Sequence, residues 1–246
     1  MKKYPIIDVT NTIQGEGTRA GSRAVFLRLG GCNMWSGRPQ DRGKGAGACA
    51  MWCDTEFFNG RTLMTAEEIV AALNEQWPGE GKRWVVLTGG EPLLTIDQEL
   101  VRALRDAGWS LALETNGSIA TPSDDFDHVC VSPKLTKEGT YDFDSLKVTD
   151  ATEYKVVLPG IAAGRGWSQE MLEELKAKTK ADHYYLQPQD VTDPTNVEIS
   201  FLKNGRTTAT SESRYKRHLA DTVQMMFVLD DGWQLSLQTQ KYIDMP

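Results

Sequence analysis

Short apolar runs that end in glycine or polar residues alternate with amphipathic segments along this chain, and this alternation limits the folds open to it. Residues 24–31, 83–92 and 109–117 are runs of the first kind and predict buried strands. Residues 62–77 and 95–108 lie between them and carry apolar side chains at helical spacing. Because parallel strands need a crossover connection, the pattern predicts βαβ units and a parallel sheet.

The rest of the chain continues the same pattern. Thr65 precedes Glu67 and Glu68 and is the predicted N-cap of the first helix, because a threonine hydroxyl can accept from first-turn amides. Residues 11–24 predict a polar, glycine-rich loop. The remaining predicted elements are strands at 4–10, 128–134, 152–160, 182–190 and 233–239, helices at 168–180 and 217–229, and an irregular insertion at about 190–212.

Polar side chains stand at or near the predicted carboxyl end of most strands. In parallel α/β sheets, ligands collect at these ends. The sequence therefore predicts one active face on which residues from separate strands meet. These residues are Arg28 with Cys32, Thr88 to Glu91, Glu114 to Asn116, Ser132 to Lys134, and Gln187 to Asp190.

Length and charge restrict the function further. At 246 residues with 40% apolar composition, the chain is long enough for one substantial core, and we expect a single domain. A net charge of −7 with scattered basic residues disfavours direct binding to nucleic acid. No run approaches the roughly 18 to 20 apolar residues that span a bilayer, and the run before Asp8 is too short for a signal peptide. We therefore expect a cytoplasmic protein without membrane association.

Three of the four cysteines, Cys32, Cys49 and Cys53, lie within residues 30–55. Cysteines gathered in this way in a chain without a secretory signal are more often metal ligands than disulfide partners. Three thiolates can hold three irons of a cubane cluster and leave the fourth iron open. A zinc site is the alternative, but zinc takes a fourth ligand and the histidines are remote in sequence. Cys130 stands alone in an apolar run and is expected to be a small buried side chain.

Short motifs stand along the chain in a specific order. They are IQGEG at 13–17, FLRLGGCN at 26–33, WSG at 35–37, CDTEF at 53–57, TGGEP at 88–92, ETNG at 114–117, SPK at 132–134, QP at 187–188 and SLQTQKYIDMP at 236–246. In this order and spacing they resemble the radical S-adenosylmethionine enzymes, and among them the 7-carboxy-7-deazaguanine synthases of 7-deazapurine (queuosine precursor) biosynthesis. The resemblance covers nearly the whole chain.

The cysteine spacing is similar to that of one subgroup of this family. Sixteen residues separate Cys32 from Cys49, as in synthases whose first gap is enlarged. Three residues separate Cys49 from Cys53, one more than usual, and Trp52 supplies the aromatic residue before the last cysteine. The resemblance implies that the three cysteines hold a 4Fe-4S cluster and that residues 33–48 are an insertion in the cluster loop.

The resemblance also implies a fold and a reaction. The fold is an α/β, open, partial parallel β/α barrel of the radical S-adenosylmethionine type, with about six core strands and few helices. The reaction converts 6-carboxy-5,6,7,8-tetrahydropterin to 7-carboxy-7-deazaguanine with loss of ammonia, as a carbon-nitrogen lyase. It is a radical ring contraction that uses S-adenosylmethionine, a 4Fe-4S cluster and Mg²⁺. A glycyl-radical activase is the alternative within the class, and a non-catalytic zinc- or iron-binding module is the alternative outside it.

For the cofactors, the resemblance places the methionine amine of S-adenosylmethionine beside Glu91, since a carboxylate pairs well with an ammonium. It also allows Lys134 to form an ion pair with the methionine carboxylate. Thr55 resembles the family's Mg²⁺ ligand, and one protein oxygen can suffice because Mg²⁺ keeps waters. The residues alone allow simpler interpretations. The turn that carries Glu91 would be an ordinary strand-to-helix turn, Lys134 would be a solvated surface lysine, and Thr55 would make a local backbone hydrogen bond. The expected S-adenosylmethionine-binding residues are Trp52, Asp54, Gly90, Glu91, Ser132, Pro133, Lys134, Gln187, Pro188, Gln189 and Asp190.

For the pterin substrate, the guanidinium of Arg28 suits a fork with the carboxylate, and Glu16 can accept from the guanidine-like edge. A mutual ion pair between Glu16 and Arg28 is the simpler interpretation. Gln240 stands where close relatives carry histidine, and it can donate a hydrogen bond but cannot titrate. In related enzymes the terminal carboxylate reaches the substrate, which implicates Pro246. The expected substrate-binding residues are Ile13, Gln14, Gly15, Glu16, Arg28, Thr88, Gln240 and Pro246.

The resemblance alone implies the partners. They are a flavodoxin- or ferredoxin-type electron donor and a second copy of the chain in a homodimer. No side chain is expected to act as the catalyst by itself, because the cofactors supply the reactivity. Residues 33–48 provide no identified ligand, and we expect them to cap the cluster or to dock the electron donor.

Overall fold

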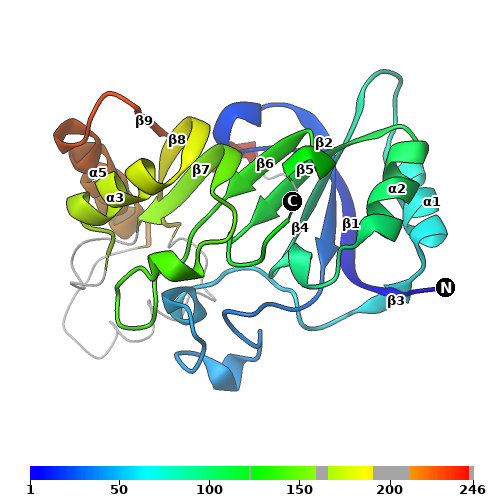
Figure 1. Cartoon of the computed structure of the whole chain (residues 1–246), viewed down its shortest axis with the longest axis horizontal. Helices are drawn as coiled ribbons and strands as arrows, with labels where there is room; N and C mark the ends of the chain where they lie inside the picture. Colours follow the sequence, from blue (N-terminus) through cyan, green and yellow to red (C-terminus); the bar gives the residue numbers. More distant parts are fainter. Residues whose placement is uncertain (122, 159–165, 191–210, 244–246) are drawn as a thin grey trace.

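The structure is a computed structural model that describes residues 1–121, 123–158, 166–190 and 211–243. Within these residues, nine strands form a single sheet (Figure 1). In their order across the sheet they are β3 (Thr62–Met64), β1 (Tyr4–Ile13), β2 (Arg23–Leu29), β4 (Arg83–Gly89), β5 (Trp109–Thr115), β6 (His128–Val131), β7 (Asp150–Leu158), β8 (Lys180–Pro188) and β9 (Trp233–Leu235).

The sheet is mostly parallel and does not close. Each neighbouring pair from β2 to β9 is parallel, whereas β1 is antiparallel to both β2 and β3. The edge strands β3 and β9 do not pair with each other. The predicted open, partial parallel barrel is thus confirmed: β2 and β4 to β8 form its core, the short β9 extends it, and β1 with β3 adds an antiparallel edge.

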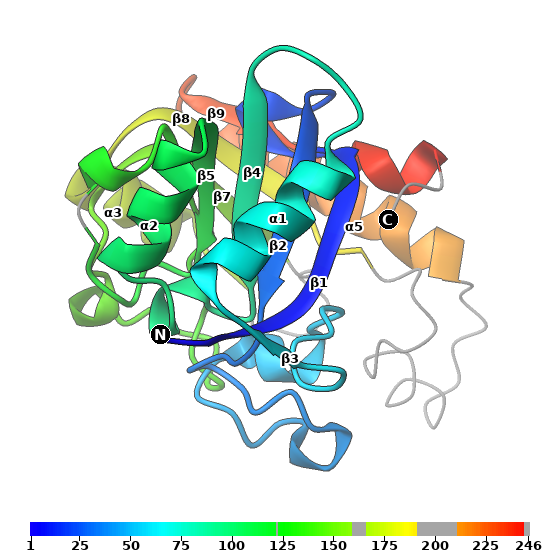
Figure 2. The same cartoon turned by 90° about the vertical axis from the view of Figure 1, so that its right-hand side faces the viewer.

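In the part of the chain that the structure describes, the helices pack against the sheet in two pairs, one toward each end (Figures 1 and 2). Helices α1 (Ala66–Gln76) and α2 (Gln98–Asp106) pack on the half formed by β1, β2 and β5. Helices α3 (Gln169–Lys178) and α5 (Ser211–Val228) pack on β8, and α5 also reaches β9. Among the described residues, no helix combines the length and apolarity needed to cross a membrane.

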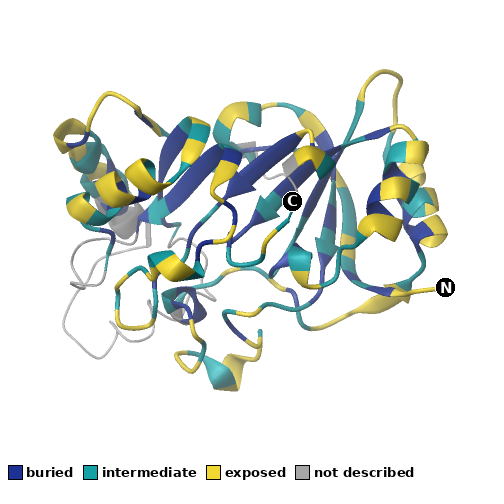
Figure 3. Cartoon of the chain, viewed as in Figure 1, coloured by how far each residue is buried: buried dark blue, intermediate teal, exposed yellow. Residues whose placement is uncertain are grey.

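The two faces of the sheet bury different kinds of side chain. On the helix-covered face, alternate residues such as Val85 and Leu87 are fully buried in the main core together with residues of α1 and α2. Val86, which points the other way, belongs to a small separate cluster. Further along, Glu153 and Lys155 are also almost completely buried. Figure 3 shows how burial concentrates in the strands and leaves the outer sides of the helices exposed.

The start of α1 follows from its local sequence. The hydroxyl of Thr65 accepts a hydrogen bond from the Glu68 amide at 3.3 Å, and the Glu68 carboxylate accepts from the Thr65 amide at 2.7 Å. This reciprocal capping box satisfies two amides that the first turn leaves without helical partners. Ile69 and Leu73 then fall on the buried face of the helix. The predicted N-cap at Thr65 is confirmed.

Some predicted boundaries are wrong. Residues 11–13, predicted as loop, extend β1 because they pair with residues 23–25 of β2. Strand β3 was expected to be part of the first helical segment, but its three residues pair with β1 instead. In both cases a long-range partner, rather than local propensity, sets the conformation. Of the predicted irregular segment 190–212, residues 191–210 lie outside the described residues.

We expect Thr65→Ala to lower the unfolding free energy by about 1 kcal/mol, because it removes one half of the capping box. In a chain of this size that loss should lower the melting temperature by roughly 2 to 4 °C. Thermal unfolding of the metal-free protein measures the change. Thr65→Ser keeps the hydroxyl and should melt close to the unsubstituted protein; equal losses in both variants would contradict the capping role.

Candidate active site

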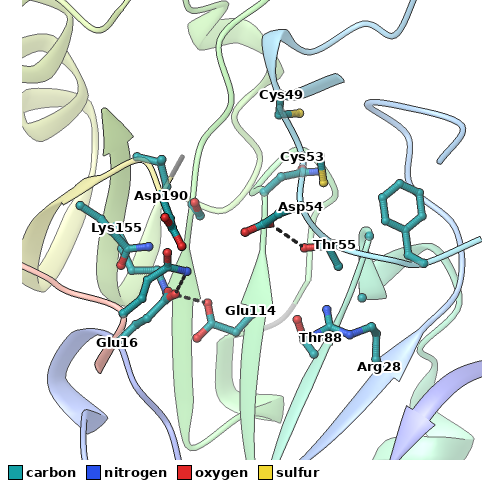
Figure 4. A pocket seen from close by; sticks show the side chains of 18 of the residues that line it. Glu16, Arg28, Cys49, Cys53, Asp54, Thr55, Thr88, Glu114, Lys155 and Asp190 are labelled. Atoms are coloured by element: carbon teal, nitrogen blue, oxygen red, sulfur yellow. Dashed lines mark hydrogen bonds and ion pairs between the residues drawn. The ribbon is translucent and has the colours of Figure 1, made fainter. Parts of the chain in front are cut away.

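A cavity of about 560 Å³ opens at the carboxyl ends of the parallel strands. Its volume falls in the range of small-molecule and cofactor sites. The wall combines side chains from β2, β4, β5, β7 and β8 with the cysteine loop (Figure 4). Of the residues predicted to bind a metal, S-adenosylmethionine or substrate, those that line it are Ile13, Gln14, Glu16, Arg28, Cys32, Cys49, Trp52, Cys53, Asp54, Thr55, Thr88, Gly90, Ser132, Lys134, Gln187, Pro188, Gln189, Asp190 and Gln240.

Four predicted residues are not placed on the wall. Gly15, Glu91 and Pro133 do not line the cavity. Pro246 lies outside the described residues.

The last two cysteines are joined by a single helical turn. The amide of Cys53 donates to the carbonyl of Cys49 at 2.7 Å, and the amide of Trp52 donates to the same carbonyl at 3.0 Å. A gap of three residues is therefore the spacing of one α-turn, which brings the two side chains to neighbouring positions. Cys32 joins them from the end of β2, where its sulfur accepts from the Met34 amide at 3.4 Å.

The three thiols are free and lie in a poorly solvated environment. Burial raises the pKa of Cys49 to about 12 and raises those of Cys32 and Cys53, while the nearby Lys134 opposes the shift in all three. Thiolates at these positions need a cation close by, and a bound metal deprotonates a coordinating thiol outright. Among the described residues, no three His, Cys, Asp or Glu side chains converge tightly enough to hold a single metal ion.

Two glycines at the end of β4 let the TGGEP turn lie directly against the cysteine-bearing end of β2. A Cβ atom on Gly89 would come within 2.3 Å of the Leu29 carbonyl oxygen. A Cβ on Gly90 would come within 2.4 Å of the Gly31 carbonyl oxygen and 2.6 Å of the Cys32 Cβ. These contacts involve rigid backbone, so only glycine fits at either position.

Glu91 makes its contacts within the protein. Its carboxylate is fully buried and accepts from the Thr115 hydroxyl at 2.9 Å and from the amides of Asn116 and Leu93 at 2.7 and 3.1 Å. Burial raises the pKa of Glu91, and these hydrogen bonds work against the increase. The sequence placed this carboxylate beside a ligand ammonium; the structure uses it to fasten the end of β5 to the turn after β4.

A buried ion-pair network occupies another part of the cavity wall (Figure 4). The ammonium of Lys155 lies 2.5 Å from Glu16 and 3.1 Å from Glu114. Gln14 donates to Glu114 at 3.0 Å, and Gln238 donates to Glu16 at 2.8 Å. The alternative expectation that Glu16 pairs with Arg28 is wrong, since Lys155 takes that place. Lys155 was not predicted, although a lone lysine in an apolar strand is the signal that could have found it.

Charge attraction keeps Glu16 and Lys155 ionised. Burial alone would raise the pKa of Glu16, but the charge of Lys155 and the hydrogen bonds to the carboxylate lower it. Burial likewise disfavours the Lys155 ammonium, yet the groups facing it, which are Cys130, Glu114, Glu16 and Glu153, raise its pKa well above the usual value. Burial also raises the pKa of Cys130, so the carboxylates supply the attraction. At neutral pH this part of the cavity presents the ionised Glu16 carboxylate beside the Lys155 ammonium.

The segment after β9 docks against the loop after β1. The amide and hydroxyl of Thr239 donate to the Gly15 carbonyl at 3.0 and 2.9 Å. A Cβ on Gly15 would lie 1.5 Å from the Gln240 side-chain oxygen, so this glycine permits close packing. Lys241 adds ion pairs to Asp190 at 2.6 Å and to Asp54 at 3.3 Å. The sequence suggested docking of the chain's end, but Lys241 itself was not predicted.

Arg28 and Thr55 face the cavity from different elements. Arg28 stands opposite Thr88 in the register of β2 and β4, and Figure 4 shows the two side chains together. Burial lowers the pKa of Arg28, whereas Asp8 and Asp54 raise it. The Thr55 hydroxyl donates to the Asp54 carboxylate over a long 3.4 Å. The expected local contact of Thr55 is therefore to a side chain rather than to the backbone.

An open, mostly parallel sheet with three free thiols beside a cavity at its carboxyl edge is the arrangement expected of a radical S-adenosylmethionine enzyme. The crystal structure of QueE from Escherichia coli shares this fold, with a TM-score of 0.60 and 24% identity over 96% of this chain and 94% of that chain. No protein-family model matches the sequence.

Two similar proteins, both named 7-carboxy-7-deazaguanine synthase, identify the family. The protein from Burkholderia multivorans is 37% identical, and the alignment covers 99% of each chain. The protein from Caulobacter vibrioides is 35% identical with the same coverage. This chain belongs to the 7-carboxy-7-deazaguanine synthase family.

We expect Lys155→Met to destabilise the protein more at pH 8 than at pH 5. In the native protein, the folded-state pKa of Glu16 lies below its unfolded value of about 4.5, so the pair stabilises above that pH and loses its effect as the pH falls through the lower folded value. Without Lys155, burial raises the pKa of Glu16 instead, and the ionised carboxylate destabilises as the pH rises. The loss should reach roughly 3 kcal/mol at pH 8.

Urea unfolding of the metal-free protein at the two pH values measures this difference. Lys180→Met is the matched control, because Lys180 pairs with Asp150 at 3.2 Å on the exposed surface. That variant should lose less than about 1 kcal/mol at either pH. An equal loss at pH 5 and pH 8 for Lys155→Met would contradict the buried ion pair.

Proposed function

We propose that this protein converts 6-carboxy-5,6,7,8-tetrahydropterin to 7-carboxy-7-deazaguanine with loss of ammonia. The observation that carries the proposal is the composition of one cavity. All three thiols line it; Cys49 and Cys53 lie on one side, Arg28 and Thr88 on another, and the network of Glu16, Lys155 and Glu114 on a third (Figure 4). The names of the full-length relatives point to the same product.

The residues at the thiol side fit a 4Fe-4S cluster. Cys32, Cys49 and Cys53 supply three ligands, which leaves one iron open for S-adenosylmethionine. Lys134, on the same wall, supplies positive charge close to all three thiols. With S-adenosylmethionine bound, the cluster supplies a radical able to abstract hydrogen from a carbon atom. The protein's contribution is to hold the reactants in place and to keep solvent from them.

For S-adenosylmethionine we propose the wall between the cysteine turn and the ends of β6 and β8. Lys134 donates to the Ser132 hydroxyl at 2.6 Å, which holds its ammonium where it can meet the methionine carboxylate. Gly90 leaves room beside Cys32, and Trp52 and Asp54 flank the cysteine turn. Glu91 acts indirectly, by fixing the turn that carries Gly90. The other expected contacts are Pro133, Gln187, Pro188, Gln189 and Asp190.

For the pterin we propose that two charged regions fix its orientation. Arg28 forms the fork with the substrate carboxylate, a geometry that its planar guanidinium matches. At the other end, Glu16 and Glu114 are acceptors for the N–H groups of the guanidine-like edge, and both pair with Lys155. Among the described residues, the buried side-chain oxygen of Gln240 has no hydrogen-bond partner, and we propose it as a further acceptor. The other expected contacts are Ile13, Gln14, Gly15, Thr88 and Pro246.

We further propose that Thr55 provides the protein oxygen for Mg²⁺. Thr55 lines the cavity, and within the described part of the chain its hydroxyl has only a long contact with Asp54, so little is lost when it turns to a metal. Mg²⁺ keeps several waters and shares substrate oxygens, which suits a site with few protein ligands. The family further suggests a cytoplasmic homodimer reduced by a flavodoxin- or ferredoxin-type protein.

Anaerobic reconstitution tests the function directly. We expect the visible absorption of a 4Fe-4S cluster, and consumption of the carboxy-tetrahydropterin when S-adenosylmethionine, Mg²⁺ and a reductant are present. Cys49→Ser should lose both, whereas Cys130→Ala, which removes a cysteine buried in β6, should keep both. A zinc-containing, colourless protein, or turnover only with a partner protein as substrate, would refute the proposal.

We expect Arg28→Lys to raise KM for the pterin by roughly 10- to 100-fold, the effect of weakening hydrogen bonds between charged groups. Initial-rate kinetics measures the change. A tetrahydropterin without the carboxylate, used as a competitive inhibitor, should bind the variant and the native enzyme equally. Arg23→Lys, an exposed change at the start of the same strand, is the control and should leave KM unchanged. Equal weakening of both pterins would show that Arg28 does not contact the carboxylate.

A further inference from the structure

Residues 33–48 contain none of the predicted ligands, although Met34 lines the cavity, and they form a loop that returns to its own beginning. The amide of Gly47 donates to the Met34 carbonyl at 3.3 Å. A Cβ on Gly45 would lie 2.2 Å from that same carbonyl oxygen, so the two ends of the insertion pass in close contact. The amide of Ala48 then donates to the Leu135 carbonyl at 2.8 Å, which anchors the loop beside the SPK segment.

A small apolar cluster lies between this loop and the cysteine turn. Trp35, Ala50 and Phe57 are buried in it, and Cys32 and Cys53 pack against it. Trp35 and Phe57 meet edge to face, with ring centroids 5.5 Å apart. Trp35 thus places one edge of the insertion directly against the residues that surround the thiols.

Arg42, near the middle of the insertion, connects the loop to the cysteine turn. Its guanidinium lies over the Trp35 ring, 4.0 Å from the centroid. One terminal nitrogen donates to the Cys53 carbonyl at 2.8 Å, and the other donates to the Ala50 carbonyl at 3.4 Å. Both carbonyls belong to the turn that joins Cys49 to Cys53.

The turn needs such donors because it is too short to satisfy its own carbonyls. A single helical turn leaves its last carbonyl groups without amide partners. A basic side chain near the end of the turn can donate hydrogen bonds to these carbonyl groups instead. Arginine can donate to two carbonyls while it stacks on an aromatic ring, and lysine cannot do both. The bond to Cys53 also acts on the backbone of a cluster ligand.

We propose that residues 33–48 brace the cluster-binding turn, and that Arg42 is the positioning residue that holds the Ala50 and Cys53 carbonyls and so fixes the placement of Cys49 and Cys53. The inference rests on the proposed cluster at these cysteines. It gives the insertion a role inside the protein, in place of a cap over the cluster or a docking surface for an electron donor.

Variants of the reconstituted holoenzyme test the brace. Iron release to a ferrous chelator under anaerobic conditions should be roughly tenfold or more faster in Arg42→Ala, because hydrogen bonds from a charged donor are lost. Arg42→Lys should also release iron faster than the native protein. Arg38→Ala is the matched control, since Arg38 lies in the same insertion but over Phe58, 4.9 Å from its ring centroid. Arg38→Ala should release iron at the native rate.

Two further measurements separate positioning from general destabilisation. The EPR spectrum of the reduced cluster, with and without S-adenosylmethionine, should change in Arg42→Ala and stay native in Arg38→Ala. Millimolar guanidinium should slow iron release from Arg42→Ala by refilling the site over Trp35, and it should have no effect on Arg38→Ala.

Each result bears on the inference. Native iron release and a native spectrum in Arg42→Ala, equal acceleration in both arginine variants, or no rescue by guanidinium would overturn it. Failure of the unsubstituted protein to take up any cluster would instead overturn the proposed function, and the brace with it.

Discussion

The close approach of β2 and β4 at their carboxyl ends is the constraint on which the site depends. Gly89 and Gly90 bring the TGGEP turn against the backbone of Leu29 and Gly31, at distances where no side chain fits. Arg28 and Thr88 are neighbours in this pairing, and Cys32 follows directly. Glu91 then ties the turn to the end of β5 through hydrogen bonds from Thr115 and Asn116. One parallel strand pair thus sets the relative position of a thiol, an arginine and the cavity wall.

The two faces of the sheet serve different purposes. The helix-covered face buries aliphatic side chains and stabilises the fold through area removed from water. The other face buries Lys155 among carboxylates, an arrangement that hydrophobic residues of similar size would often match or exceed in stability. The charges are consistent with a binding role, because ionised carboxylates in a poorly solvated cavity discriminate strongly between N–H donors and acceptors. Stability and recognition are therefore assigned to opposite sides of the same strands.

Local patterns predicted the parts of the structure that local interactions determine. The capping box at Thr65, the alternating strands and the gathering of polar strand ends follow from spacing along the chain. The family was recognised from the order of short motifs that lie far apart in the sequence, most of which line one cavity in the structure. Lys155 was missed because its partners come from other parts of the chain, and the hydrogen bonds of Glu91 to Thr115 and Asn116 could not be predicted because those donors stand at the end of another strand. β3 likewise gains its conformation only from its pairing with β1.

The contacts between the segment after β9 and the loop after β1 affect the order in which the site can assemble. Thr239 and Gly15 are 224 residues apart, so this contact closes a very long loop and contributes only late in folding. During synthesis, the cysteine loop emerges long before residues 236–241 exist to complete the cavity wall. A nascent chain therefore exposes its thiols before the pocket is complete. Cluster insertion is accordingly expected after residues 236–241 have folded onto the cavity wall.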